Sequence, residues 1–211
     1  MTTDILFVVG LFTAVVWCGA QAMKAITTTQ GVSLAQYIAF SLGFMIQFML
    51  ALEAGRKNPG LIISQQISLF GIWSTCSAIL VAVVATRGHY SWSQADTMIA
   101  RFAGVGLVVT IVWAFSTKKP MDDAAVRAWL NISLKSLPQF LLITKILTEG
   151  SAGITWIAIV LGEASILTRL IPLSVSMKTE GVNRDKVWLL VSDAINLVSW
   201  TAVTIVWLLK K

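Results

Sequence analysis

Four ionisable residues stand inside stretches of sequence that are otherwise apolar, and they comprise two of each sign: Lys135, Glu163, Arg169 and Asp193. A charge at the centre of a bilayer costs between about 2.5 and well over 10 kcal/mol, so such residues are rarely without a role. A helical rise of about 1.5 Å per residue places Lys135 and Glu163 at similar depth, roughly 14–15 Å from the N-terminal side, and predicts that they pair. Asp193 and Arg169, at roughly 9 and 6 Å, are predicted to form a second ion pair.

Two interpretations of these charges remain open. In the first, they form a neutral buried network that locks neighbouring helices together. In the second, Asp193 or Glu163 takes up and releases protons as the pairs break and re-form, because a carboxylate that loses its cation in an apolar setting is harder to ionise. Asp193 ranks first as the proton-coupling residue because Asn196 follows it closely on the same stretch.

A polar stripe accompanies the first of these charges. Asn131, Lys135 and Gln139 recur every four residues, so a helix projects all three from one face. Lipid chains cannot form hydrogen bonds with the polar groups on such a face. We expect it to border a cavity or another helix.

Composition identifies the environment in which these residues act. The chain has 211 residues, of which 56% are hydrophobic and only 12% charged, and its mean hydropathy is +0.79. These values exclude a disordered chain and a nucleic-acid-binding protein, and they indicate an integral, multi-pass membrane protein. Two cysteines and a single histidine predict neither a disulfide scaffold nor a metal site, and no cofactor is expected.

The elements that must position these residues are long apolar helices. Stretches of about 20 apolar residues can cross a bilayer, and seven are found, at residues 5–26, 32–52, 61–85, 97–115, 125–147, 154–173 and 187–209. The predicted fold class is therefore an all-α membrane protein with seven transmembrane helices. Basic residues in the joints favour a cytoplasmic N-terminus by a narrow margin.

The chain also contains an internal repeat. Gln21 near the end of the first stretch and Gln139 in the fifth lie 118 positions apart (139 − 21), and each is followed by two further stretches. We expect a first three-helix bundle at residues 1–86, a connector with the fourth helix at 87–119, and a second three-helix bundle at 120–211. An odd connector gives both bundles the same orientation across the membrane.

The pair Pro138-Gln139, followed by a glycine-containing loop, combines with this 3+1+3 spacing to resemble the PQ-loop superfamily, specifically the full-length SWEET-type transporters. The resemblance implies that the proline region hinges the first helix of each bundle, which points to Pro138, Gln139 and Gln21. Ala20 stands where the first repeat of that family carries its proline.

The resemblance further implies a substrate pocket between the bundles, with polar and aromatic residues from the third and seventh helices. Trp73 and Trp200 lie near the centres of these helices, and aligning them pairs Gln66 with Asp193. The expected substrate-binding residues are Gln66, Trp73, Lys135, Gln139, Asn196 and Trp200.

The expected function is transport of a small polar solute by alternating access, with proton coupling through Asp193 or Glu163 and ion-pair partners at Lys135 and Arg169. The charges favour a zwitterionic or anionic solute. The alternative is a receptor on the same fold that holds a ligand without moving it. An enzyme is not expected, since no nucleophile–base pair is evident. Expected partners are the solute, the lipid bilayer, protons and a second copy of the chain.

Overall fold

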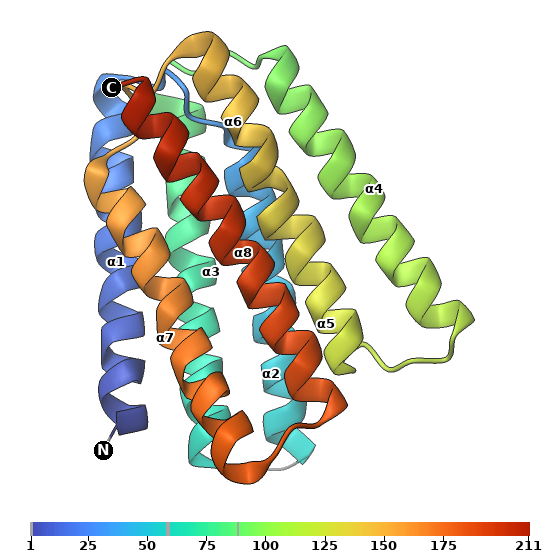
Figure 1. The fold of residues 1–211 in the computed structure, drawn as a ribbon. Coiled ribbons are helices and arrows are strands. Elements are labelled where there is room, and N and C mark those ends of the chain that lie inside the picture. The colour runs from blue at the N-terminus through green and yellow to red at the C-terminus, as the bar shows by residue number, and fades with distance from the viewer. Residues whose placement is uncertain (1, 58–59, 88) are drawn as a thin grey trace.

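The computed structural model describes residues 2–57, 60–87 and 89–211, and within these ranges it is entirely helical apart from short connections. The helices alternate in direction along the chain, except that α6 continues in the direction of α5, and the two termini lie at opposite ends of the molecule (Figure 1). The elements are α1 (Thr2–Thr27), α2 (Leu34–Lys57), α3 (Leu61–Arg87), α4 (Gln94–Ser116), α5 (Ala124–Asn131), the π-helical turn η1 (Ile132–Ser136), α6 (Leu137–Glu149), α7 (Trp156–Glu180) and α8 (Arg184–Leu209).

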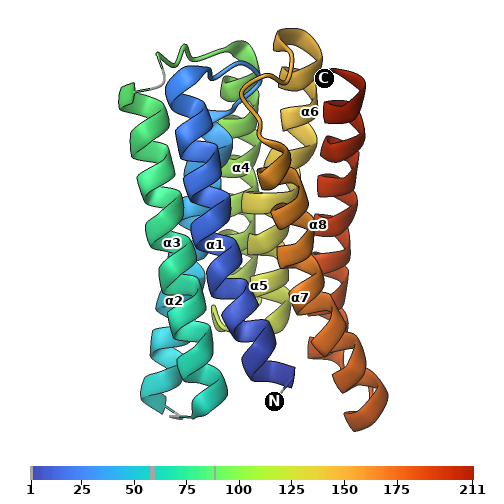
Figure 2. The same ribbon diagram turned by 90° about the vertical axis from the view of Figure 1, so that its left-hand side faces the viewer.

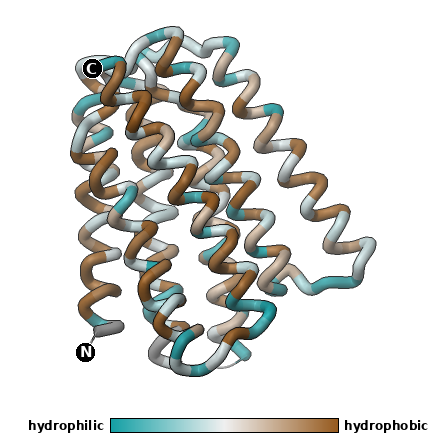
Figure 3. The backbone as a smooth tube through the Cα atoms, in the orientation of Figure 1, coloured by the Kyte–Doolittle hydropathy of each residue, from teal (hydrophilic) through white to brown (hydrophobic). Residues whose placement is uncertain are grey.

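Six of these helices are long and apolar enough to cross a membrane: α1, α2, α3, α4, α7 and α8. Large apolar side chains cover their outer surfaces, including Phe12, Val105 and Leu208, each more than half exposed. Brown, hydrophobic segments extend along the helices in Figure 3, while the connections are mostly teal or pale. An apolar exterior of this kind is compatible with lipid, so the chain is a multi-pass helical membrane protein.

The predicted fifth span, residues 125–147, is not one regular helix. It consists of α5, η1 and α6 in succession. The amide of Leu137 bonds to the carbonyl of Ile132, five residues back, and Pro138 follows directly. Because proline has no N–H and its ring would crowd the carbonyl of Leu134, the regular hydrogen-bond ladder cannot continue through this point. A wider π turn accommodates the break.

The remaining span boundaries agree with the prediction to within a few residues, with one exception. The sixth predicted span ended at residue 173, whereas α7 continues through Pro172 to Glu180. Asn183 caps the next helix by accepting a hydrogen bond from the Lys186 amide. In Figure 1 the lower part of α7 diverges from α1, whereas both helices lean in the same direction in the view of Figure 2.

The helices pack in the same order in both halves of the chain. In the first half α3 lies between α1 and α2, and in the second half α8 lies between α7 and the α5–η1–α6 segment. Contacts of α1 with α7, and of α2 with η1 and α6, close these helices into a ring. The helix α4 packs outside this ring against α2 and the α5–η1–α6 segment (Figure 1).

A buried polar network fixes α4 at the C-terminal end of the bundle. The Lys145 ammonium group on α6 forms an ion pair with Asp96 on α4, and both side chains are almost completely buried. Asp96 also accepts a hydrogen bond from Ser33, and Lys145 donates one to the Tyr90 hydroxyl. Burial holds the pKa of the Tyr90 phenol above its ordinary value, so this hydroxyl remains neutral and can accept from Lys145.

Candidate functional site

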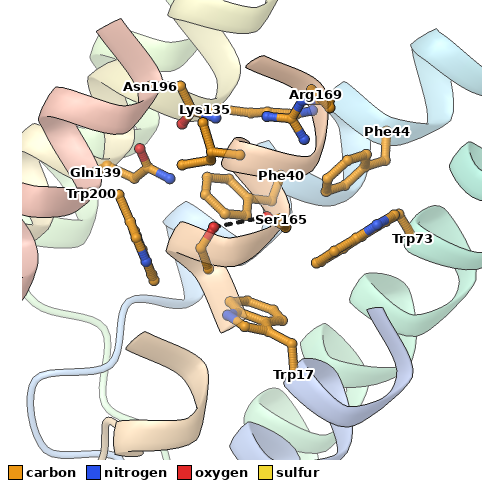
Figure 4. A pocket seen from close by; sticks show the side chains of 12 residues that line it. Trp17, Phe40, Phe44, Trp73, Lys135, Gln139, Ser165, Arg169, Asn196 and Trp200 are labelled. Atoms are coloured by element: carbon orange, nitrogen blue, oxygen red, sulfur yellow. Dashed lines mark hydrogen bonds between the residues drawn. The ribbon is translucent and has the colours of Figure 1, made fainter. Parts of the chain in front are cut away.

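A narrow cavity of about 30 Å³ lies inside the ring of helices, and we call it the inner chamber (Figure 4). This volume holds about one water molecule. Its walls come from α1, α2 and α3 in the first half and from η1, α6, α7 and α8 in the second. The lining residues are Trp17, Phe40, Phe44, Trp73, Lys135, Gln139, Gly162, Ser165, Ile166, Arg169, Asn196 and Trp200.

A second cavity of about 220 Å³ lies nearer the N-terminal side, and we call it the vestibule. Its residues also come from both halves of the chain: Gln47, Gln66, Phe70, Arg127, Asn131, Lys135, Arg169, Leu173, Leu189, Ser192 and Asp193. Lys135 and Arg169 line both cavities. The two charges therefore stand at the boundary between a polar vestibule and an aromatic inner chamber.

The predicted ion pair of Arg169 and Asp193 is present. Nη2 of Arg169 lies 3.1 Å from Oδ1 of Asp193, and Nε donates to the same oxygen at 3.2 Å. The side chains are 27% and 13% exposed, respectively, so the pair is only partly buried. The contact joins α7 to α8 at the inner end of the vestibule.

The predicted pair of Lys135 and Glu163 does not form. Glu163 instead accepts a hydrogen bond from Thr204 on α8, and it lines neither cavity. The two residues match in depth but not in direction. The α7 residues that line the inner chamber, such as Gly162 and Arg169, recur at helical spacing, and Glu163 is turned about 100° from Gly162 on the helix.

Lys135 is a buried lysine without a carboxylate partner among the residues that the structure describes. The residue is 3% exposed, and its ammonium nitrogen lies 3.7 Å from the centre of the Phe44 ring. Attraction to the ring face offsets part of the cost of burial. It does not supply the negative charge that a buried ammonium requires, because buried ions are normally compensated by paired charges.

The amide side chains around the inner chamber differ in how well they are bonded. Gln139 accepts a hydrogen bond from Ser199 on α8, so it serves as an interhelical contact as well as a wall. The Oδ1 atom of Asn196 is buried without a partner. Gln66 lies in the vestibule, separate from the inner chamber that contains Asn196.

The aromatic residues pack as a group. Trp73 stacks on Phe44 with ring centres 5.0 Å apart, and it lies 5.9 Å from Trp17. Trp200, from the opposite half, donates its indole N–H to the carbonyl of Ile159. In Figure 4 Trp17 and Trp73 lie at one end of the chamber, while Lys135 and Asn196 lie at the other.

The residues expected to act as hinges occupy different environments. Pro138 adjoins the π turn, and Gln139 follows it. Gln21 lies within the uninterrupted helix α1, where its side chain donates to the carbonyl of Gly153 at 2.7 Å and accepts from the amide of Thr155 at 3.2 Å. Gln21 therefore joins the two halves of the chain.

These contacts of Gln21 belong to a closed layer on the C-terminal side of the inner chamber. Trp17 donates to the carbonyl of Ala158, and the amide of Gly153 donates to the carbonyl of Gln30. Gly31 meets the carbonyl of Gly150 so closely that a side chain there would collide with it. Within the described residues, the hydrogen bonds between α1 and the α6–α7 region all lie on this side.

Several lining residues were not predicted as site residues. Arg127 continues the four-residue spacing of Asn131, Lys135 and Gln139, so the pattern could have identified it. Trp17 lies 118 positions before Lys135 (135 − 17), which is the repeat offset. Phe40 and Phe44, by contrast, have no distinguishing signal in an apolar stretch.

The charges and amides of these cavities can bind and orient a polar solute. In the described part of the chain, no three His, Cys, Asp or Glu residues come together as metal ligands. Comparisons with protein-family models, with curated proteins and with solved structures found no match. Any assignment of function must therefore come from the site itself.

Proposed function

We propose that the protein is a membrane transporter of a small polar solute that works by alternating access. The observation that carries this proposal is a pair of neighbouring cavities between the two halves of the chain. Both cavities are lined by Lys135 and Arg169. The wider cavity lies toward the N-terminal side. The narrower one is closed toward the C-terminal side by hydrogen bonds between the halves.

The proposed architecture is seven transmembrane helices in two parallel three-helix bundles, with α4 as the connector. The α5–η1–α6 segment contains 26 residues, from Ala124 to Glu149, and at about 1.5 Å per residue it is long enough to span. The shared packing order, with the third helix of each half in the middle, supports a parallel repeat.

In this proposal the two bundles rock against each other around the inner chamber. The arrangement described here corresponds to a state that is accessible from the N-terminal side. Transition to the opposite state requires the Trp17 and Gln21 contacts to α7 and its preceding loop to break. The break in the helix at η1 and Pro138 would let α5 and α6 move separately.

Proton coupling, if the transporter uses it, is assigned to Asp193 rather than Glu163. Asp193 lines the vestibule and pairs with Arg169, so a solute that competes for Arg169 would weaken the pair. A carboxylate deprived of its cation binds a proton more readily. Glu163 lines neither cavity, which separates it from the solute.

Flux measurements in proteoliposomes test the proposal. Radiolabelled amino acids, carboxylates, sugars and nucleosides are offered at two pH values, and at least one is expected to accumulate faster than in empty liposomes. The variant Asn196→Leu is expected to lower that uptake at least tenfold, since it removes a polar group from the inner chamber. Glu163→Gln is the matched control and should retain uptake.

Saturable binding without flux of any of these solutes would contradict transport and would favour a receptor on this fold. Equal loss of uptake in Asp193→Asn and Glu163→Gln would contradict the assignment of coupling to Asp193. Loss of folding is monitored separately by the elution profile of each variant in detergent.

A further inference from the structure

The charges that line the two cavities are unequal in number. Three side chains are basic, Arg127, Lys135 and Arg169, whereas Asp193 is the one acidic side chain in the described lining. Arg169 and Asp193 neutralise each other. Neither Lys135 nor Arg127 makes an ion pair with a described residue, so the cavities carry an excess of positive charge.

This excess selects the charge of the solute. A buried ammonium group without a counter-charge is costly, and a bound anion would remove that cost. A cationic solute would meet three cations and one carboxylate. The guanidinium group of Arg169 has five donors. Nε donates to Asp193 and Nη2 lies 3.1 Å from the same oxygen, so donors remain for a second anionic group at the boundary of the cavities.

The hydrogen-bonding atoms beside Lys135 also fit an anionic group. Asn196 is 3% exposed, its Oδ1 atom has no partner, and Figure 4 places it next to Lys135. Rotation of the amide by 180° presents an N–H at the same place. A carboxylate lying there would receive donors from Lys135, Arg169 and Asn196, which is a charge-assisted arrangement.

The other end of the inner chamber selects the shape of the solute. Five aromatic side chains form its walls: Trp17, Phe40, Phe44, Trp73 and Trp200. The ring planes of Trp73 and Phe44 make an angle of only 19°, and aromatic rings favour stacked contacts of this kind. The chamber, at about 30 Å³, is too small to hold a ring in this state, so its aromatic walls must separate when the solute binds. A flat ring requires less separation than a bulky, non-planar one.

We propose that the solute is a small planar anion, with a single carboxylate bound by Lys135 and Arg169 and an aromatic ring held among the tryptophans of the inner chamber. This assignment rests on the proposed function of the same site. The carboxylate binds where the vestibule meets the chamber. The ring then points toward Trp17 and Trp73, beneath the closed layer formed by Gln21.

Binding of benzoate to the detergent-purified protein tests this assignment. Apparent affinity is measured by isothermal titration calorimetry, alongside benzamide, which lacks the charge, and cyclohexanecarboxylate, which lacks the planar ring. Benzoate is expected to bind at least tenfold more tightly than benzamide and severalfold more tightly than cyclohexanecarboxylate. Equal affinity for benzoate and benzamide, or for benzoate and cyclohexanecarboxylate, would overturn the proposal.

Variants locate the binding within the cavities. Lys135→Met is expected to weaken benzoate binding by about tenfold or more, while Lys178→Gln, which removes an exposed charge outside both cavities, should not. Trp73→Leu is expected to weaken benzoate more than cyclohexanecarboxylate, with Trp156→Leu as the exposed control. Unchanged benzoate affinity in both Lys135→Met and Trp73→Leu would refute the site.

Flux separates this proposal from the one on which it rests. Benzoate binding without uptake of any solute into proteoliposomes would contradict transport but support the proposal that the ligand is a planar anion. Uptake of a neutral sugar, with no binding of benzoate, would support transport but contradict the proposal that the solute is a planar anion.

Discussion

Lys145 and Asp96 form an ion pair at the C-terminal end of the bundle, where the α1–α2 and α3–α4 connections supply the neighbouring hydrogen-bonding groups. Neither side chain has appreciable contact with solvent, and Ser33, Tyr90 and Ser93 complete the hydrogen bonding around them. An ion pair of this kind need not add stability compared with an apolar pair, but removal of one member leaves a buried charge alone. A single substitution at either residue should therefore lower the stability of the protein more than a substitution in an exposed ion pair.

Replacement of Asp96 by Asn is expected to lower the free energy of unfolding by about 3 kcal/mol, because the Lys145 ammonium loses its fully buried partner and keeps only the partly exposed carboxylate of Glu149, 3.5 Å away. Thermal unfolding in detergent measures the effect. The double variant Asp96→Asn/Lys145→Met should recover part of the loss. Glu53→Gln removes the exposed ion pair with Lys57 and should change stability by less than about 1 kcal/mol. A similar loss in both single variants would contradict this account.

At the scale of single residues, the sequence predicts how far along its helix a charged residue lies better than it predicts which way the side chain points. Depth follows from counting residues along a helix, and it placed Arg169 beside Asp193. The side of α7 on which Glu163 emerges depends on how that helix is rotated within the bundle, which neighbouring helices determine. The apolar pattern around Lys145 likewise does not reveal that Asp96 lies opposite it.

At the scale of the helices, length and hydropathy predicted most of the fold. The expected spans begin and end close to α1, α2, α3, α4 and α8, because a run of apolar residues interrupted by polar joints admits few alternatives in lipid. The π turn was not predicted. Pro138 signals a break, but whether the helix kinks, ends or widens depends on the packing of η1 against α2 and α4.

Replacement of Pro138 by Ala is expected to convert η1 and α6 into a regular helix, because the new N–H can bond to the carbonyl of Leu134. Since a π turn contains one extra residue, its loss rotates Arg127 and Asn131 by about 100° relative to Gln139. Uptake should fall at least fivefold, while the melting temperature should not fall. Pro120→Ala, in the connection before α5, is the control and should leave uptake unchanged.

Retained uptake together with an unchanged melting temperature in Pro138→Ala would indicate that the π turn persists without the proline. That result would assign the turn to packing around Ser133 and Lys135 instead, both of which are buried. A lower melting temperature would contradict the expectation that a regular helix is accommodated.

For the molecule as a whole, the closed side depends on few contacts. Trp17 and Gln21 link α1 to Ala158, Gly153 and Thr155, whereas the lower part of α7 diverges from α1 (Figure 1). Each hydrogen bond of this kind contributes about 0.5–1.5 kcal/mol. The balance between the state described here and one open toward the C-terminal side is therefore sensitive to Gln21.

Replacement of Gln21 by Ala is expected to shift this balance by about 1–3 kcal/mol, which changes the population of the second state five-fold or more. A cysteine introduced at Ser165, which lines the inner chamber, reports the change in a background with Cys18→Ala and Cys76→Ala. A membrane-impermeant maleimide applied from the C-terminal side should label Cys-substituted Ser165 faster when Gln21 is replaced. Gln94→Ala, at the exposed start of α4, is the control. Faster labelling from the N-terminal side alone would mean that Gln21 does not close the chamber, because the loss of a C-terminal contact can open only the side on which the contact lies.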